Sequence, residues 1–318
     1  MKEGDAFLGE GWTPDRLGDL RSKTFLVTGA SSGTGYEAAK KLLASGAHVV
    51  MLNRNEAKTL ECIKTLRKEL GEDIEVTFIA MDLADLSSVR GAAAEVKKQV
   101  EKIDALICNA AIAQVARREL TVDGFESQLG TNYYGNFLLI NLLFGKVQES
   151  GGRIVVVSSI GYKLGKKKIL FDDMSFEKGY DPNDAYSQSK LALMMFVYEL
   201  QRRLKKKGVS TEALVCHPGS ASTSLINQSA PYLTRCLWYI ISSLPIVQTA
   251  EQGAFSQLMC ATEPNLEQAA FYGPTGSLEF CGPVGRGTLE EFVFDEAVAL
   301  QLWDVSTKAT NSDWDFLK

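Results

Sequence analysis

The sequence predicts a single-domain, doubly wound α/β fold, in which a seven-stranded parallel sheet carries helices on both faces. Two observations predict it. Short runs of β-branched and apolar residues alternate with longer amphipathic stretches, and continuous apolar strands are typical of a parallel sheet buried on both faces. No repeat, low-complexity tract or Pro/Gly/Ser linker interrupts this alternation. We therefore expect one domain over residues 22–275.

The strands and helices follow in chain order. The expected strands are 24–29, 48–52, 76–81, 104–108, 153–158, 211–216 and a weaker 269–273. The main expected helices are 55–70, 85–101, 122–149 and 186–206. We expect an N-terminal extension at 1–21 and a C-terminal extension at 276–318. The latter contains a closing amphipathic helix (289–309), and its expected inward side chains are Phe292, Val293, Ala297, Leu300 and Trp303.

Two long connections interrupt the simple alternation, at 160–184 and 217–249. Each follows the carboxyl end of a strand, where ligands bind in open α/β sheets. We expect them to be the walls of a substrate site. The apolar segment 232–248 leaves three alternatives open: a hydrophobic lid, a shallow membrane-contacting helix, or inter-helix core.

Composition excludes several classes of function. A net charge of −5 argues against nucleic-acid binding, which needs a basic face. The six cysteines are spread without a CxxC pair, which suits reduced thiols in a cytoplasmic protein better than disulfides or a zinc site. The two histidines, His48 and His217, are too few to favour a Ser-His-Asp hydrolase or a His-rich metal enzyme. We expect no metal, no secretory signal and no membrane span.

A glycine-rich turn, "TGASSGTG" (28–35), directly follows the first strand and opens a helix. Glycines there allow a tight turn and a close backbone approach, so that amides at the helix start can face a pyrophosphate. The spacing G-x-x-x-G-x-G differs from the commoner G-x-G-x-x-G. The expected phosphate-binding residues are Gly29, Ser31, Ser32, Gly33, Thr34 and Gly35.

The second strand ends in Asn53 and Arg54, with no acidic residue at that edge. A carboxylate there would bind a ribose 2′-hydroxyl, whereas an arginine favours a 2′-phosphate. The sequence therefore predicts NADP(H) rather than NAD(H). The alternative is that Arg54 is a solvated turn residue.

Three tyrosines, Tyr36, Tyr162 and Tyr186, have a lysine four residues later. Spacing alone leaves all three open, but only Tyr186 lies on a predicted helix between a strand ending in Ser158 and Ser159 and a strand that ends in "HPG". Tyr186 and Lys190 would share one helical face, and a nearby ammonium would lower the tyrosine pKa from about 10. We expect Tyr36 to be structural. Tyr162, in a loop, is a candidate for the substrate pocket.

Several motifs together resemble the classical short-chain dehydrogenase/reductase family. They are "TGASSGTG", "MDL" with Asp82, "CNAA" (108–111), "TNYYGNF" (131–137), "VVVSS" (155–159), "AYSQSK" (185–190) and "HPGSAST" (217–223). They occur in the family's order over roughly residues 22–275. The start "GWTPDRLGDL", the long segment after Ser159 and the tail "LWDVS" resemble the branch of retinol dehydrogenases, WW-domain oxidoreductase and light-dependent protochlorophyllide reductase.

The resemblance implies a Rossmann fold and a role for each matching residue. It assigns the catalytic tetrad to Asn132, Ser159, Tyr186 and Lys190. Tyr186 would donate or accept a proton, Ser159 rather than Ser158 would bind the substrate oxygen, and Asn132 would hold a water that links Lys190 to solvent. The resemblance also implies cofactor contacts by Tyr186 and Lys190. Asp82 and Leu83 would lie beside the adenine, Asn109 and Ala110 behind the adenine ribose, and Pro218, Gly219 and Thr223 near the nicotinamide. Ala111 is a further implied contact, at a position where the family more often has glycine. A helix cap is the alternative for Asp82.

These observations predict an NADP(H)-dependent oxidoreductase that transfers hydride between a nicotinamide and the alcohol or carbonyl group of a moderately large apolar substrate. Two alternatives stay open: a protochlorophyllide-type C=C reductase, and a non-enzymatic NADP(H)-binding sensor or scaffold. The expected location is cytoplasmic, with a peripheral membrane contact through 232–248 as an option. In similar proteins helices such as 122–149 and 186–206 form homodimer or homotetramer faces.

Overall fold

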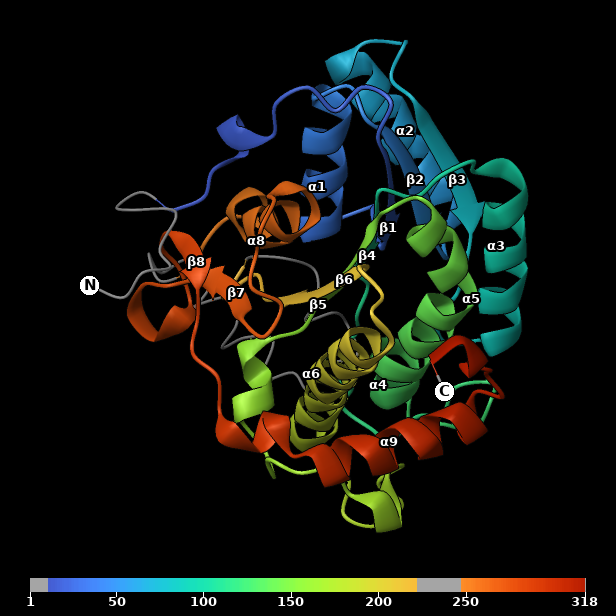
Figure 1. Cartoon of the computed structure of the whole chain (residues 1–318), viewed down its shortest axis with the longest axis vertical. Coiled ribbons are helices and arrows are strands. Elements are labelled where there is room, and N and C mark those ends of the chain that lie inside the picture. Colours follow the sequence, from blue (N-terminus) through green and yellow to red (C-terminus); the bar gives the residue numbers. More distant parts are fainter. Residues whose placement is uncertain (1–10, 222–246, 318) are drawn as a thin grey trace.

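The computed structural model describes residues 11–221 and 247–317. In this part of the chain one sheet runs through the molecule in the order β3-β2-β1-β4-β5-β6-β7-β8 (Figure 1). The strands are β1 (Thr24–Thr28), β2 (His48–Asn53), β3 (Val76–Ala80), β4 (Ala105–Cys108), β5 (Arg153–Val157), β6 (Glu212–Cys216), β7 (Phe271–Pro274) and β8 (Val284–Arg286). The predicted doubly wound fold is confirmed, and the strand order reverses between β1 and β4, where ligands bind in such sheets.

The number of strands was predicted wrongly, because the described sheet has eight strands rather than seven. Strands β1–β7 are parallel to their neighbours, and β8 pairs antiparallel with β7, with Tyr272 opposite Arg286. The missed strand has three residues and lies among glycines. It is too short to show a period of two.

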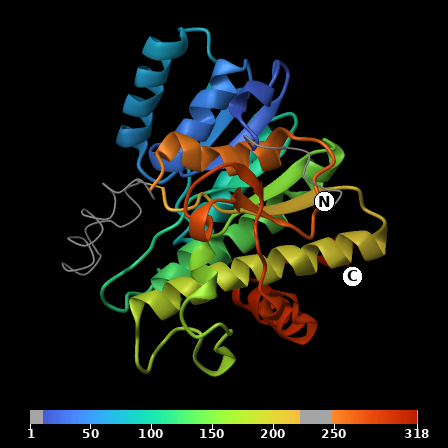
Figure 2. The same cartoon turned by 90° about the vertical axis from the view of Figure 1, so that its left-hand side faces the viewer.

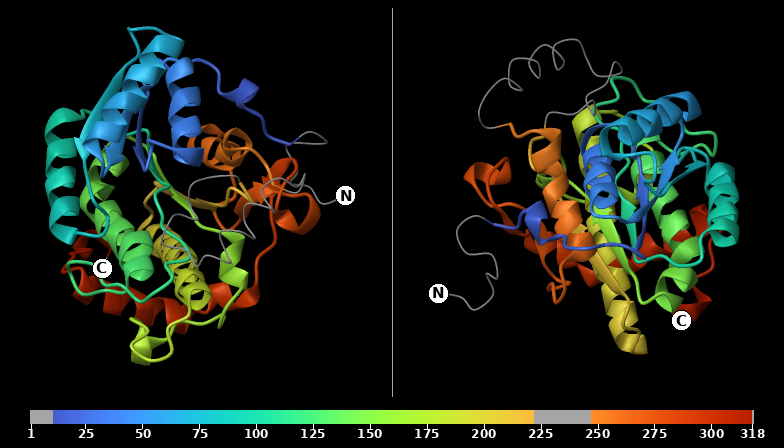
Figure 3. Two further views of the ribbon diagram at one scale, coloured as in Figure 1. Left: turned by 180° about the vertical axis from the view of Figure 1, so that it is seen from behind. Right: turned by 90° about the horizontal axis from the view of Figure 1, so that it is seen from above.

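Helices cover both faces of the sheet, and each layer has its own hydrophobic core. On one face lie α1 (Gly33–Ala44), α2 (Glu56–Leu70) and α8 (Ala250–Thr262). On the other lie α3 (Leu86–Gln99), α4 (Ser127–Leu129), α5 (Gly135–Glu149) and α6 (Pro182–Lys207). Figure 3 shows the two layers from behind and from above.

Two helices differ from their predicted bounds. The helix expected at 122–149 begins only at Ser127, and a π-helical turn, Gly130–Tyr134, separates α4 from α5. The residues before α4 form a turn, and an antiparallel bridge between Leu120 and Glu126 closes this turn. Helix α6 begins four residues earlier than expected, because Asp181 caps it through the backbone N–H groups of the next two residues after Pro182.

The closing helix α9 (Glu296–Ala309) lies outside α6, as Figure 2 shows. Its Trp303 ring lies 5.6 Å from Phe196 of α6 and 4.7 Å from Trp314. Val293 and Trp303 are buried and Phe292 is half-buried, as predicted, but Ala297 and Leu300 are exposed. The helix starts only after Asp295, so its apolar period passes through Ala299, Leu302 and Trp303 instead.

The C-terminal segment also packs against α5 and α6, the helices that correspond to the expected homodimer or homotetramer faces. Nearly every residue of α6 from Ser187 to Leu200 is buried within the chain. The N-terminal segment is likewise packed: Trp12 is buried and donates a hydrogen bond to Glu263 beyond α8, at 2.8 Å. In the described ranges no helix combines the length and apolar character needed to cross a membrane.

The docking of α9 predicts a contrast between two of its residues. Trp303→Ala removes a fully packed indole and should lower the free energy of unfolding by about 3–5 kcal/mol. Leu300→Ala alters a side chain that is 46% exposed and should change it by about 0.5 kcal/mol or less. Urea unfolding followed by circular dichroism measures both. Equal losses would contradict the observed orientation of α9.

Candidate active site

A cleft of about 490 Å³ opens at the carboxyl ends of the strands. Both long connections contribute to its walls, as predicted: the segment after β5 supplies Ile160, Gly161 and Leu164, and the segment after β6 supplies residues 218–221. The full lining comprises Gly29, Ser31, Ser32, Gly33, Thr34, Asn109, Ala110, Ala111, Ala113, Gln114, Val157, Ser158, Ser159, Ile160, Gly161, Leu164, Asn183, Tyr186, Lys190, Pro218, Gly219, Ser220, Ala221 and Phe280.

The glycine-rich turn forms one end of the cleft. Gly29 and Gly33 have φ of +69° and +60°, values that favour glycine. A Cβ on Gly35 would lie 2.4 Å from the Gly29 carbonyl oxygen, so only glycine fits there. Ser32 precedes α1 with extended backbone and makes no side-chain cap. The amino end of α1 is therefore open to an anion, as a pyrophosphate requires.

Asn109 braces this turn from the end of β4. Its amide Nδ2 donates to the Thr28 carbonyl at 3.0 Å, and its Oδ1 accepts from the Thr34 hydroxyl at 2.9 Å. The backbone N–H groups of Asn109 and Ala110 both donate to the Thr28 hydroxyl, at 2.9 Å. The side chain of Asn109 is thus committed to the shape of the turn, while Ala110 and Ala111 line the cleft.

The residues expected at the adenine end lie at the ends of β2 and β3. Asn53 is buried and its Oδ1 accepts from the Ala30 N–H at 2.7 Å, which fixes the turn. The Arg54 side chain is 71% exposed and lies 3.7 Å from the Asp82 carboxylate. Asp82 accepts from the Ala84 N–H at 2.9 Å, and the cap of α3 is Asp85. The alternative of a helix cap at Asp82 is therefore wrong.

Leu83, the other residue expected beside adenine, is buried. Its carbonyl oxygen lies against the start of α5, where a Cβ on Gly135 would come within 2.4 Å of it. This close approach places the end of β3 directly beside the π-helical turn.

Tyr186 and Lys190 lie one turn apart on α6 and face the cleft. Lys190 is only 2% exposed, and its ammonium donates to the Val157 carbonyl of β5 at 3.0 Å. Its Nζ lies 5.8 Å from the centre of the Tyr186 ring. Lys190 is thus fixed at the end of β5, with the half-buried Tyr186 beside it.

Burial dominates the acid–base properties of this pair. It lowers the pKa of Lys190 to about 7. It also raises the pKa of Tyr186, against the opposing effect of a hydrogen bond from Ser159. The lowered tyrosine pKa that the sequence led us to expect is not found. The cause is the burial of the phenol itself, which disfavours the charged phenolate.

The structure distinguishes the two serines after β5. Ser159 lines the cleft, begins the 3-10 turn Ile160–Lys163 and accepts from the Gly161 N–H at 3.0 Å. Ser158 is buried, and its hydroxyl donates to the Lys190 carbonyl at 3.0 Å. Both serines line the cleft, but the Ser158 hydroxyl ties β5 to α6, whereas the Ser159 hydroxyl lies beside Tyr186.

Asn132 lies in the π-helical turn, away from the cleft surface. It is fully buried and exchanges two hydrogen bonds with the backbone of Ile112, at 2.8 and 2.9 Å. Its Nδ2 also donates to the Ser189 hydroxyl at 3.0 Å, and that hydroxyl donates to the Tyr186 carbonyl at 2.7 Å. Asn132 thus holds the backbone of Tyr186. The sequence motif located this residue but not the π turn, a feature frequent at functional sites.

The other two tyrosines take structural positions. Tyr36 is half-buried against the core around α1 and α2. Tyr162 is fully buried behind the cleft, and its hydroxyl accepts from the Glu290 N–H at 3.2 Å, so its expected place in the pocket is wrong. The nearby apolar core around Phe271 draws the ring inward.

Of the residues expected near the nicotinamide, Pro218 and Gly219 line the cleft. Thr223 and most of the segment 232–248 lie outside the described residues. Sequence reasoning missed Phe280, Gln114 and Asn183, which also line it. The Gln114 amide donates to the Asn183 Oδ1 at 2.9 Å. No motif marks these residues, since only the fold brings their segments together.

Comparison with known proteins shows the family of the chain. Residues 23–171 match the family described as short chain dehydrogenase. Retinol dehydrogenase 14 of Homo sapiens is 38% identical over 303 residues, which span 91% of this chain and 86% of that protein. Polyprenol dehydrogenase of Homo sapiens is 35% identical over 259 residues, 80% of this chain and 74% of that protein.

A solved structure is also similar. The crystal structure of an uncharacterized protein from Mycobacterium paratuberculosis matches with a TM-score of 0.77 and 34% identity, covering 96% of this chain and 99% of that one. The fold, the glycine-rich turn and these similarities lead to one conclusion. The chain belongs to the short-chain dehydrogenase/reductase family of oxidoreductases, which bind a nicotinamide cofactor, and within it to the retinol dehydrogenase-like branch.

Proposed function

We propose that the protein is an NADP(H)-dependent oxidoreductase that interconverts an alcohol and a carbonyl group on a moderately large apolar substrate. One observation carries the proposal: the Tyr186 phenol, the Ser159 hydroxyl and the buried Lys190 ammonium converge on a cleft whose far end is the open amino terminus of α1. An anion site and a proton donor on one cleft are what reduction by a dinucleotide requires.

The residues present fit a dinucleotide. The uncapped start of α1 and the close-packed Gly35 suit a pyrophosphate. When bound, the nicotinamide supplies or accepts the hydride. Ser159 orients the substrate oxygen and Tyr186 gives that oxygen a proton during reduction, or takes it during oxidation. Lys190, with a pKa near 7, exchanges protons at neutral pH beside the tyrosine, and Asn132 holds the helix that carries both.

The substrate side of the cleft favours an apolar compound. The apolar part of the cleft lining includes Ala113, Ile160, Leu164 and Phe280. Two relatives are named for retinol and for polyprenol, both alcohols with an isoprenoid carbon chain. We therefore expect activity on isoprenoid-like alcohols and aldehydes, and a polar substrate would leave these side chains without a matching surface.

The choice of NADP(H) rests on Arg54. Its guanidinium is mostly in solvent at the end of β2, where a ribose phosphate would lie, and its carboxylate neighbour Asp82 is 3.7 Å away. A planar guanidinium binds phosphate through two parallel hydrogen bonds, which outweigh one exposed ion pair.

Replacing the proton donor should separate catalysis from binding. Tyr186→Phe removes the hydroxyl that faces the cleft, and we expect turnover of an apolar aldehyde with NADPH to fall by about 10²-fold or more. NADPH affinity, measured by fluorescence titration, should stay within about twofold. Tyr36→Phe is the matched control, since Tyr36 also has a lysine four residues later but packs in the core. Full activity in Tyr186→Phe would refute the mechanism.

Arg54→Ser tests the cofactor assignment. Loss of hydrogen bonds to a charged phosphate should raise the KM for NADPH by about tenfold or more, because such bonds contribute about 1.5–3 kcal/mol. The KM for NADH should change by less than about threefold. Initial rates with both cofactors decide the matter, and a wild-type protein that prefers NADH at equal concentration would overturn it.

The pKa of Lys190 predicts a dependence of stability on pH. Above pH 7 the folded lysine is largely neutral while the unfolded lysine stays protonated up to its ordinary pKa, so unfolding takes up a proton. This group therefore adds to the free energy of unfolding as the pH rises from 7 to 9, by at most about 1.4 kcal/mol per pH unit.

Urea unfolding at pH 7, 8 and 9 measures this contribution. Lys190→Met should lose the increase relative to the wild type. Lys64→Met, at a side chain that is 80% exposed, should retain it. Parallel curves for the wild type and Lys190→Met would show that Lys190 is not buried as described.

A further inference from the structure

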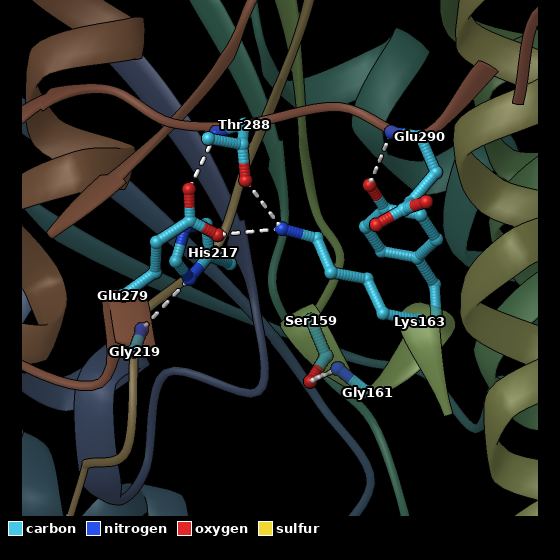
Figure 4. Close-up of polar contacts among 9 residues, drawn as sticks. Ser159, Gly161, Lys163, His217, Gly219, Glu279, Thr288 and Glu290 are labelled. Atoms are coloured by element: carbon cyan, nitrogen blue, oxygen red, sulfur yellow. Dashed lines mark hydrogen bonds and ion pairs between the residues drawn. The ribbon is translucent and has the colours of Figure 1, made fainter. Parts of the chain in front are cut away.

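A cluster of three polar residues joins the Ser159 turn to the C-terminal part of the chain. The Lys163 ammonium lies 2.7 Å from the Glu279 carboxylate and 2.7 Å from the Thr288 hydroxyl (Figure 4). The Thr288 N–H donates to the other Glu279 oxygen. The Lys163 and Glu279 side chains are only 21% and 13% exposed. These three residues close a polar knot between segments more than a hundred residues apart in sequence.

Lys163 of the knot lies four residues after the catalytic serine, Ser159. Lys163 ends the 3-10 turn that Ser159 begins. Tyr162 in the same turn is held by the Glu290 N–H and by the rings of Phe271 and Phe292, at 5.8 and 6.0 Å. The turn also touches the proton donor, because a Cβ on Gly161 would lie 3.0 Å from the Tyr186 ring. A shift of this turn would change the placement of Ser159 relative to Tyr186.

The other end of the knot positions a second residue of the cleft lining. Leu278 and Glu279 have φ of 54° and 58°, a left-handed conformation that costs free energy in residues other than glycine. Phe280 follows directly, lines the cleft and accepts from the Ser220 N–H at 2.7 Å. Gly219, packed against the Phe280 carbonyl, has room for no side chain there. Contacts made by Glu279 therefore hold a strained turn whose next residue forms the cleft wall.

The pKa of Glu279 agrees with a stable ion pair between Glu279 and Lys163. Burial raises the pKa of Glu279, but hydrogen bonds from Lys163 and Thr288 outweigh this effect and hold the pKa below its ordinary value. The carboxylate thus stays ionised at neutral pH. Removing one partner of such a pair leaves a poorly solvated charge, so the two turns would rearrange together.

We propose that Lys163 and Glu279 are positioning residues: their ion pair, completed by Thr288, holds Ser159 and Phe280 in place in the lining of the substrate cleft. The inference rests on the proposed function for its kinetic consequence, and on the contacts alone for its structural one. Neither residue contacts the reacting atoms. Lys163 acts through the turn that Ser159 begins, and Glu279 acts through the adjacent Phe280.

Hydrogen exchange and kinetics together test the proposal on the full-length protein. In Lys163→Met, amides of residues 159–164 and 276–281 should exchange at least about tenfold faster, because a local contact worth about 1.4 kcal/mol is lost. With the apolar aldehyde that the wild type turns over best, kcat should fall about tenfold or more, since small misplacements cost large factors. The KM and the NADPH affinity should stay within about threefold.

Control variants separate positioning from general damage. Lys166 lies in the same loop as Lys163 but outside the knot, and it forms an ion pair with Asp184 of α6. Lys166→Met should leave the exchange rates and kcat near their wild-type values. Lys163→Arg keeps the charge, and its kcat should stay within about threefold of the wild-type value.

Glu279→Gln should lower kcat as much as Lys163→Met does. The double variant Lys163→Met/Glu279→Gln should lower kcat no further than either single variant, because the same interaction is removed in each. The double variant leaves no unpaired charge, which keeps the test valid if a single variant folds poorly.

The outcomes are distinct. Exchange and kcat that change together in Lys163→Met but not in Lys166→Met support the proposal. Unchanged exchange overturns it, whatever the activity. Faster exchange with unchanged kcat overturns the link to catalysis. A wild-type protein without turnover on any alcohol or aldehyde defeats the proposed function instead, and the exchange data alone then decide whether the knot holds the two walls.

Discussion

The hydrogen bond from the buried Lys190 ammonium to the Val157 carbonyl is the interaction on which the site depends. It joins the middle of the sheet to the helix that carries Tyr186, and it does so with an ionisable side chain that is only 2% exposed. Burial of an ionisable group normally costs free energy. The chain tolerates this cost at Lys190, beside the phenol that faces the cleft, which is typical of a group retained for chemistry.

Other contacts extend the same constraint outward. Ser158 binds the Lys190 carbonyl, and Asn132 binds Ser189, so three hydrogen bonds hold α6 at residues 189 and 190. The glycine-rich turn is fixed in a comparable way by Asn109, Thr28 and Asn53. The two ends of the cleft are therefore rigid before any ligand binds, and preorganised donors of this kind contribute more to rate than donors that must move.

The sequence predicted the fold and the central residues because their signals are local. Continuous apolar strands, the glycine turn before α1 and the Tyr186–Lys190 spacing each lie within one segment, and each segment has the expected structure. The failures were of three kinds: β8 is too short to show a period, the period of α9 restarts after Asp295, and Tyr162 is drawn inward by a core that forms only in the fold. Phe280 and the Lys163–Glu279 pair depend on contacts between distant segments, which one sequence does not display.

The central claim is that the cleft directs hydride from a nicotinamide to a carbonyl carbon, with Tyr186 protonating the oxygen. Its most direct test is the fate of a labelled hydride. NADPH carrying deuterium at both C4 positions is incubated in the dark with an apolar, unsaturated aldehyde, and the product is analysed by mass spectrometry. The expected product is an alcohol with one deuterium on its carbinol carbon. Deuterium on a carbon of a reduced C=C bond, or no transfer to the substrate, would contradict it.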